Sequence, residues 1–431
     1  MLLRLADAFL PAQEGDYFSW PLLTDLFPWQ HSGVQLKRMW PIAETEDVLR
    51  ERWDALLTAT DRQAAFRESR DRTISGRYPS LDDPTLRSKP LREETVTDPV
   101  PGIARFGFRS LDRQWLLKDA RLGDFVRPTL WHAHGPRQVY LTSLLTGVLG
   151  EGPAAIVSAE VPDLHHFRGS FGGKDAVPLW RDRDATEPNV TAGLLDLLTT
   201  TYGDAVSADD LFAYAYALLV TPTYAARFAE ELTIPGPRLP LTKRPDLFRR
   251  GATLGRGLIH LHTYGERFAD ADGRRGVPQG RARSLTGVPL TPDGYPDGFA
   301  YDAGTETLRV GAGEIGPIDH RVWDYAVSGL HVVRSWLAYR MADRAGRSSS
   351  PLDEIRPAAW SAQLTRELLE LLWAIEATVA SEPALAELLA EVVASPLFSA
   401  TDLPSPSPEQ RLPPVIVRDA GGFQQSGLAL D

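Results

Sequence analysis

The spacing of apolar residues changes near residue 205, and this change restricts what kind of fold the chain can form. Before it, short runs such as FGFRSLDRQWLL, RQVYLTSLL and AAIVSAEV alternate in the way that β-strands do. After it, SADDLFAYAYALLVTPTYAARFAEEL repeats apolar residues at helical spacing, with Ser207 as a helix cap and Pro222 in the first turn of a second helix. The sequence therefore predicts an α+β fold, with a strand-rich part followed by helical parts.

Composition and periodicity divide the 431 residues into six segments. Further helices are expected at EDVLRERWDALL, PDLFRRGATLGRGLIHLHTYG, HRVWDYAVSGLHVVRSWLAYRM and RPAAWSAQLTRELLELLWAIEATVA, and a hairpin is expected to turn at Gly304. The segments are an aromatic and apolar stretch at 1–58, an Arg- and Pro-rich connection at 59–104, the strand-rich part at 105–204, a helical part with basic loops at 205–345, an acidic helical part at 346–400, and a Pro- and Ser-rich tail at 401–431 that we expect to be poorly ordered.

Charge is distributed unevenly along the chain. The net charge is −11, but residues 351–431 hold 12 acids against 4 bases. Residues 236–285 hold 11 bases against 4 acids, and residues 102–140 hold 7 against 3. A local excess of Lys and Arg can attract a polyanion despite an acidic total. From charge alone, a solubilising surface is as good an interpretation of these clusters as a phosphate-binding one.

The absence of cysteine excludes disulfides, thiolate metal sites and a cysteine nucleophile. No apolar run reaches the length of a membrane span, and no basic region followed by an apolar stretch and a cleavage site opens the sequence. We therefore expect a cytoplasmic protein with no membrane partner.

The stretch HFRGSFGGKD at 166–175 contains the small residues and the lysine of a phosphate-binding loop. However, Arg168 and Asp175 stand where that motif requires a glycine and a hydroxyl. The stretch follows one expected strand and precedes AVPLW, which favours a connection between two strands. Elsewhere the chain has no G-x-S-x-G elbow, and the glycines of GATLGRG lie inside a helical pattern, which excludes a dinucleotide fingerprint.

Three histidine pairs, at 132/134, 165/166 and 260/262, suggest metal binding at first sight. None has a neighbouring carboxylate cluster or an HExxH pattern that would complete a ligand set. Structural or surface roles are therefore expected for these histidines. No arrangement of residues supports an independent enzyme.

Several stretches, taken in their order along the chain, together resemble those of a known family. They resemble the C-terminal specificity region of Type ISP restriction-modification enzymes and of related adenine-methylating phage-defence proteins. The resemblance covers roughly 105–345, and more weakly 14–40, where DYFSWPLLTDLFPWQHSGVQLKR is similar to the segment that joins the methyltransferase domain to the specificity region. The stretches are PRQVYLTSLL, PDLHHFRGSFGGKDAVPLW, EPNVTAGLLDLL, DDLFAYAYALLVTPTYAARFAEEL, IPGPRLPL, YDAGTETLRV and VWDYAVSGLHVVRSWLAYRM.

The resemblance implies sequence-specific recognition of double-stranded DNA for an adenine-N6 methyltransferase. The chain departs from such enzymes because it lacks the [NDS]-P-P-[YFW] loop that holds a flipped adenine, the Gly-rich turn for S-adenosylmethionine, a Walker motif and an E-x-K nuclease signature. It thus looks like a recognition module without its own cofactor, and S-adenosylmethionine would be bound by a separate methyltransferase partner. The alternative is a scaffold subunit that holds partner proteins without binding DNA.

On this interpretation, loop side chains would read base edges, and arginine-rich segments would contact phosphates. The acidic end would lie away from DNA or dock a partner. The candidate DNA-contact residues are Arg168, Ser170, Lys174, Arg181, Arg183, Lys243, Arg244, Arg249, Arg250, Arg274, Arg275, Arg281 and Arg283.

Overall fold

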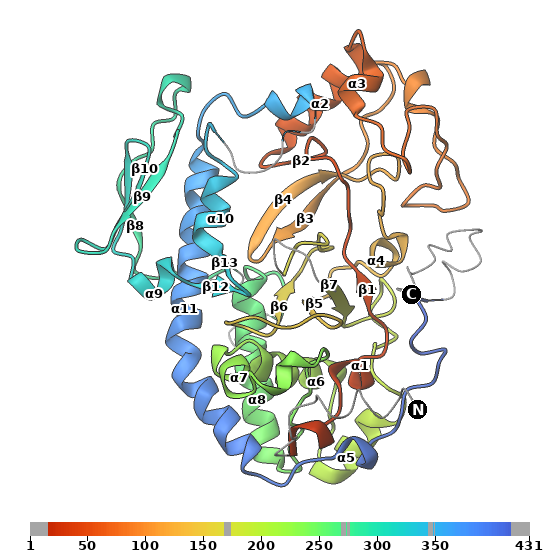
Figure 1. Ribbon diagram of the computed structural model, residues 1–431, viewed down its shortest axis with the longest axis vertical. Coiled ribbons are helices and arrows are strands. Elements are labelled where there is room, and N and C mark those ends of the chain that lie inside the picture. The colour runs from red at the N-terminus through yellow and green to blue at the C-terminus, as the bar shows by residue number, and fades with distance from the viewer. Residues whose placement is uncertain are drawn as a thin grey trace, which may run out of the picture.

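The computed structural model describes residues 16–167, 174–268, 273, 276–343, 348 and 350–414. In Figure 1 a small central sheet lies between a group of helices below it and a second sheet above it, and one long helix runs along the side of the molecule. Strands and helices occupy separate parts of the chain for the most part, which confirms the predicted α+β class. Within the described residues, no helix is long and apolar enough to cross a bilayer.

The central sheet has the strand order β1-β7-β5-β6, and all its neighbours are antiparallel. Every residue of β5 is buried, which explains the continuous apolar character of VYLTSLL. The expected strands are confirmed here, and the stretch at 166–175 does connect two of them. The strands are β1 His31–Ser32, β5 Tyr140–Leu144, β6 Ile156–Ser158 and β7 Lys174–Pro178.

The second sheet has the order β2-β4-β3, and its β3–β4 hairpin is the predicted run FGFRSLDRQWLL. Its third strand, like β1 of the central sheet, comes from the first segment of the chain. Each of these two strands is only two residues long, so no periodicity could reveal it, and only pairing with a distant partner defines it. The strands are β2 Ile42–Ala43, β3 Ile103–Arg109 and β4 Asp112–Leu117.

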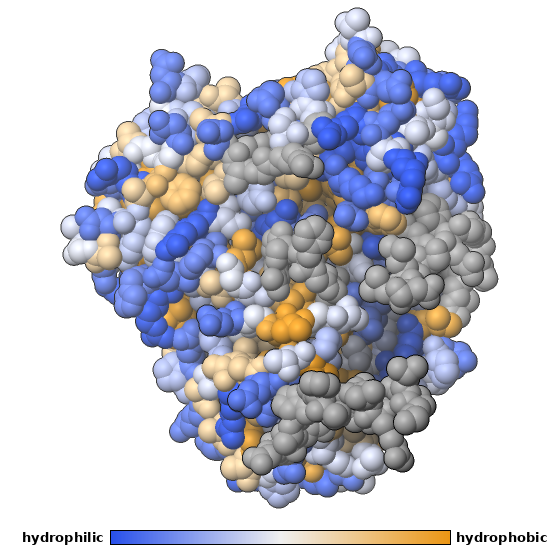
Figure 2. Space-filling model, in the orientation of Figure 1, coloured by the Kyte–Doolittle hydropathy of each residue, from blue (hydrophilic) through white to orange (hydrophobic). Residues whose placement is uncertain are grey.

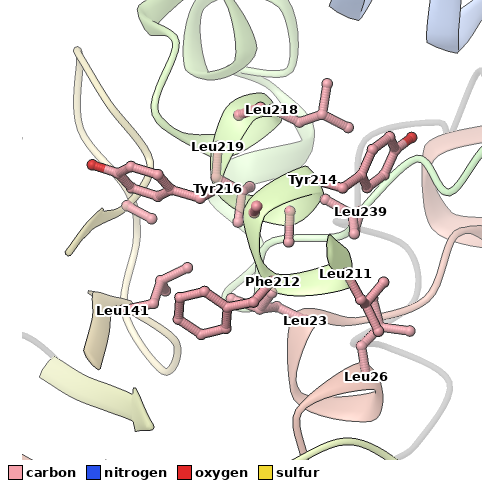
Figure 3. Close-up of a cluster of buried hydrophobic side chains, with 14 of the residues drawn as sticks. Leu23, Leu26, Leu141, Leu211, Phe212, Tyr214, Tyr216, Leu218, Leu219 and Leu239 are labelled. Atoms are coloured by element: carbon pink, nitrogen blue, oxygen red, sulfur yellow. The ribbon is translucent and has the colours of Figure 1, made fainter. Parts of the chain in front are cut away.

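The helical group forms around α6, Ala208–Leu219, in which every residue except Asp209 and Asp210 is buried. Ser207 and Asp210 form a capping box at its start, as the sequence predicts, and Thr221 caps α7, Pro222–Arg227. Figure 3 shows Leu211 directed toward Leu26 and Phe212 directed toward Leu141 of the central sheet. This helix therefore joins the sheet to the first segment of the chain.

Two longer helices complete the group. Helix α8, Pro245–His262, packs closely along α6, and α11, Ala362–Val393, crosses both. The expected apolar stripe of α11, which includes Leu364, Leu368 and Leu371, is buried. The helix is longer than expected, because it continues through Pro383. The shorter helices are α1 Leu23–Leu26, α2 Glu46–Thr58, α3 Arg62–Phe66, α4 Pro128–His132 and α5 Leu194–Tyr202.

The single helix predicted for HRVWDYAVSGLHVVRSWLAYRM is wrong. The stretch forms α9, His320–Trp323, then a two-stranded hairpin, then α10, Val332–Ala338. Ser328 and Gly329 have φ values of 48° and 81°, so they make the two-residue turn in which both central residues are left-handed. The hairpin strands are β12 Ala326–Val327 and β13 Leu330–His331.

A third sheet, with the order β8-β11-β10-β9, lies on the outer side of α11 (Figure 1). The β9–β10 hairpin confirms the predicted turn near Gly304. The inner face, with Leu308 and Ile315, is buried and the outer face is polar. The strands are β8 Arg283–Thr286, β9 Phe299–Asp302, β10 Thr307–Val310 and β11 Gly313–Gly316.

The expectation of a poorly ordered tail is wrong for residues 401–414. Arg411 pairs with Asp25 at 2.7 Å, and the guanidinium of Arg181 donates to the carbonyl oxygens of Gln410 and Leu412. Charged and carbonyl groups thus tie a Pro-rich segment that has almost no regular structure to the folded part of the chain. Composition could not show these contacts, because their partners lie hundreds of residues away.

Candidate nucleic-acid interface

Residues 162–167 lead into the central loop, which is the connection at 168–173 between β6 and β7. Neighbouring parts of the chain hold these residues in place. The Asp163 amide donates to the carbonyl oxygen of Gly107 at 2.7 Å, and the Leu164 amide donates to that of Val34 at 2.7 Å. The Asp163 carboxylate accepts from Arg109 Nη1 at 2.8 Å and from the His165 amide at 2.7 Å. The second sheet and the first segment therefore fix the direction in which the chain enters the loop.

His166 is part of this support and not a catalytic group. Its Nδ1 lies 2.8 Å from Thr142 Oγ1, and Ser110 Oγ donates to the carbonyl oxygen of His166 at 2.8 Å and to that of Phe167 at 3.1 Å. Burial lowers the pKa of His166 to about 3, so the ring is neutral at physiological pH. The opening histidine of HFRGSFGGKD is thus a structural residue.

The other end of the loop is fixed by strand pairing. In β7, Lys174 is opposite Leu144, and Asp175 is opposite Ser143 on one side and Ser32 on the other. Burial raises the pKa of Asp175, while Ser32 Oγ, 3.4 Å away, partly offsets the effect. Arg168 and Ser170, and the side chain of Lys174, lie outside the described residues, so their prediction as DNA contacts stays a prediction. Both ends of the loop that would carry these side chains are fixed by the contacts described above.

A cleft of about 280 Å³ opens beside the first of these two ends. Four basic residues and one carboxylate contribute to its lining, so its charge is predominantly positive. It is formed by segments far apart in the chain. The lining residues are Gln35, Leu36, Lys37, Arg38, Met39, Ile42, Arg67, Phe108, Arg109, Asp163, His165 and Tyr339.

The four basic residues predicted on the first half of α8 and just before it do lie together, but carboxylates already surround them. Arg250 pairs with both Glu387 and Glu391 of α11, at 2.5 and 2.7 Å. Lys243 pairs with Asp402 at 3.1 Å. The remaining two, Arg244 and Arg249, pair with Asp246 and Asp204.

These ion pairs change how the uneven charge distribution along the sequence should be interpreted. The acidic end of the chain, which we expected to lie away from DNA or to dock a partner, packs against the basic segment 236–285 along α8 and α11. Their local fields therefore largely cancel. The role of Lys243, Arg244, Arg249 and Arg250 in DNA binding stays a prediction that charge counting no longer supports.

The other candidates are dispersed. Arg181 follows β7 and is occupied by Glu187 and the tail, whereas Arg183 is exposed. Arg281 and Arg283 lie at the start of β8, on the far side of α11, where Arg283 stacks over Trp373. The remaining two, Arg274 and Arg275, lie outside the described residues.

Sequence reasoning missed the basic residues that do gather near the loop. Lys37 comes from a segment without a charge cluster, and Arg67 comes from the Arg-rich connection at 59–104, to which no DNA contact was assigned. Arg127 belongs to the basic segment 102–140; its Nε donates to the carbonyl oxygen of Gly33 at 3.2 Å, and burial lowers its pKa to about 10. Only the chain's path brings these residues to one place.

The histidines at 260 and 262 take part in packing and hydrogen bonding inside the protein. His262 is buried between Tyr216, whose hydroxyl contacts its Nδ1, and Thr378, whose Oγ1 lies 2.7 Å from its Nε2. The Nδ1 and Nε2 atoms of His260 lie 3.3 and 3.2 Å from the carbonyl oxygens of Arg267 and Gly276. Across the described part of the chain, no group of three or more His, Asp or Glu is placed to hold a metal ion.

The family model of the Type ISP C-terminal specificity domain matches residues 25–371. No curated protein matches the chain. Similar solved structures include a cryoEM structure of a DrdV–DNA complex (TM-score 0.58, 17% identity, covering 88% of this chain), a nuclease-deletion mutant of the Type ISP restriction-modification enzyme LlaGI with a DNA substrate mimic (0.54, 18%, 88%) and the ATP-dependent Type ISP enzyme LlaBIII bound to DNA (0.55, 15%, 92%). The chain spans only 38%, 29% and 24% of those three chains.

Proposed function

The chain belongs to the family of Type ISP C-terminal specificity domains, and we propose that it recognises double-stranded DNA for a restriction-modification or phage-defence system. The single observation that carries this proposal is the match over residues 25–371. The similar structures support it, since each of the three is a complex with DNA or a DNA mimic and its chain contains a part with this fold.

The central loop is the part of this chain that we assign to base reading. A base-reading side chain must be held in register with the groove, and here both ends of the loop are fixed by buried hydrogen bonds and strand pairing. Arg168 is the preferred reader, because a guanidinium can donate to both acceptors on the major-groove edge of guanine. Ser170 and Lys174 would assist it.

Methyl transfer would require a second protein or a further domain. The sequence has neither the [NDS]-P-P-[YFW] loop nor a Gly-rich turn for S-adenosylmethionine. We therefore assign the cofactor to an adenine-N6 methyltransferase partner, and this chain directs that partner to its target.

Selection of bound duplexes from a randomised library tests the proposal. The native chain, with a DNA adenine-N6 methyltransferase and S-adenosylmethionine in a parallel arm, should enrich a defined motif. The Arg168→Ala variant should enrich a motif relaxed at one position, because a bidentate base contact contributes about 1–3 kcal/mol of discrimination. Arg50→Ala, which removes an exposed arginine of α2, should leave the motif unchanged. If no duplex is enriched in either arm while the chain still captures a methyltransferase, the scaffold function is correct instead.

A further inference from the structure

One buried arginine, Arg38, joins two of the segments that line the cleft beside the loop. Arg38 donates through Nε to the carbonyl oxygens of Phe66 and Arg67, at 3.2 and 2.8 Å, and through Nη1 to that of Leu36. The same Nη1 donates to Asp124 Oδ1 at 2.9 Å. Its side chain is 1% exposed, so Arg38 cannot contact a ligand itself. Its role is to bring the segments around residues 36 and 67 to the same cleft.

Those two segments each present one exposed basic side chain. Lys37 and Arg67 both have left-handed backbones, with φ values of 59° and 58°. Such conformations are unfavourable for residues with side chains and persist where the surroundings hold them, often at binding sites. Here they occur twice in the lining of one cleft, and both times at a basic residue.

The other two basic residues of the cleft are buried or nearly so. Arg38 is buried, and Arg109, which is 11% exposed, donates to Asp163 and to the carbonyl oxygen of Phe108. Lys37 is 42% exposed; its ammonium lies over the Phe125 ring and pairs with Asp124 at 3.2 Å and with Asp71 at 3.6 Å.

Lys37 can leave both partners without leaving either carboxylate unpaired. Asp124 keeps Arg38 at 2.9 Å, and Asp71 keeps Arg70 at 3.3 Å. The pair with the partly exposed Asp71 is weak, and the buried Asp124 retains its closer partner Arg38, so a phosphate can replace these carboxylates at Lys37. The Lys37 ammonium is therefore available to a phosphate that enters the cleft.

We infer that this cleft binds a backbone phosphate of duplex DNA through Lys37 and Arg67. The inference rests on the proposed function and deepens it, because it names the backbone contact that would orient the duplex. Asp163 both lines the cleft and fixes the start of the loop, so a phosphate held there lies next to the base-reading segment. Phosphate contacts position a protein on DNA, whereas base contacts specify the sequence.

The test compares two double variants that remove the same charge. Lys37→Gln/Arg67→Gln changes the cleft, and Arg50→Gln/Arg77→Gln changes two exposed arginines outside its lining. Binding of the native chain and of both variants to one duplex is measured over a series of salt concentrations. The cleft variant should flatten the slope of log K against log salt concentration by about 1.8, which corresponds to two lost phosphate contacts, and the control variant should not.

The sequence motif enriched from the duplex library distinguishes the cleft assignment from the proposed recognition of DNA. The cleft variant should enrich the same motif as the native chain, more weakly, because a phosphate contact does not depend on sequence. Equal slopes for the two variants, with normal binding by the native chain, would overturn the cleft assignment and leave the proposed function intact. A native chain that binds no duplex would overturn the proposed function itself. Matching thermal unfolding curves check that both variants are folded.

Discussion

Arg109 and Asp163 join the end of β3 to the entrance of the central loop, with Nη1 and Oδ1 2.8 Å apart and both side chains about nine-tenths buried. The guanidinium also lies over the Phe108 ring, 3.9 Å from its centroid. A hairpin of the second sheet therefore orients a loop of the central sheet. The base-reading role that we propose for that loop depends on this junction.

Replacing Arg109 with methionine should destabilise the protein by about 3 kcal/mol, because it leaves the Asp163 carboxylate buried without its cation. The amide protons of His165 and His166 should also exchange faster. Denaturant unfolding and hydrogen exchange measure the two effects. Arg70→Met is the control, since Arg70 is 90% exposed and its ion pair with Asp71 contributes less than about 1 kcal/mol. Equal destabilisation by the two changes would contradict the importance of the junction.

The contribution of one buried carboxyl group, Glu160, to stability should fall as the pH rises from about 4.5 to 7. Burial raises the pKa of Glu160 to about 7, and the neighbouring Glu266 adds to the rise, while Arg267 and Arg113 oppose it. The adjacent His134, whose pKa burial lowers to about 4, contributes with the opposite sign, because its unfolded-state pKa lies above its folded one, and this contribution is common to the native chain and a Glu160 variant. A folded-state pKa above the unfolded one means that the protonated group favours the folded state, so its contribution is complete below pH 4.5 and lost near pH 7.

The loss amounts to roughly 3 kcal/mol, given the size of the shift. Glu160→Gln keeps the neutral form at every pH, so this variant should be more stable than the native chain at pH 8 and similar to it at pH 4.5. Unfolding free energies at several pH values give the comparison. A variant that retains the native pH dependence over this range would assign that dependence to other groups.

Glu387→Gln combined with Glu391→Gln should strengthen binding to DNA of any sequence. These carboxylates neutralise Arg250, and their removal leaves that arginine available to a phosphate. The salt dependence should become steeper by about 0.9 if one such contact forms. Glu46→Gln combined with Glu93→Gln removes the same charge elsewhere on the surface. An identical effect in both double variants would mean that only net charge matters.

Two glycines of α8, two residues apart, should respond in opposite ways to alanine. A Cβ at Gly255 would lie 1.8 Å from the carbonyl oxygen of Ala213, so Gly255→Ala must force α8 away from α6 and should cost about 3 kcal/mol or more. At Gly257 a Cβ meets nothing within 4 Å, and Gly257→Ala should stabilise the helix by about 0.5–1 kcal/mol. Thermal unfolding of the two variants checks both signs. A tolerated alanine at 255 would contradict the close helix crossing.

The polar segment 59–104 shows which surface properties composition predicts and which it does not. In Figure 2 the surface over this part of the molecule, at the upper right, is largely hydrophilic, as expected for an Arg-rich connection. Yet several of its arginines face inward. Arg72, for example, is buried and donates to the carbonyl oxygen of Ala120 at 3.0 Å. Counting charges identified the residues, but it could not separate solvated arginines from those that support an irregular backbone.

The sequence by itself determined the features that depend on neighbouring residues. The strands of the β3–β4 hairpin, the capped start of α6 at Ser207 and the proline start of α7 follow from short-range spacing and capping, and the family resemblance is carried by short stretches of sequence. The tertiary structure alone decided what depends on distant residues. It placed the acidic helix α11 against the basic half of α8, and it brought Lys37 and Arg67 to one cleft through the hydrogen bonds of Arg38. Short sequence patterns do not contain such pairings, because the partner of a charged residue is defined only once the chain has folded.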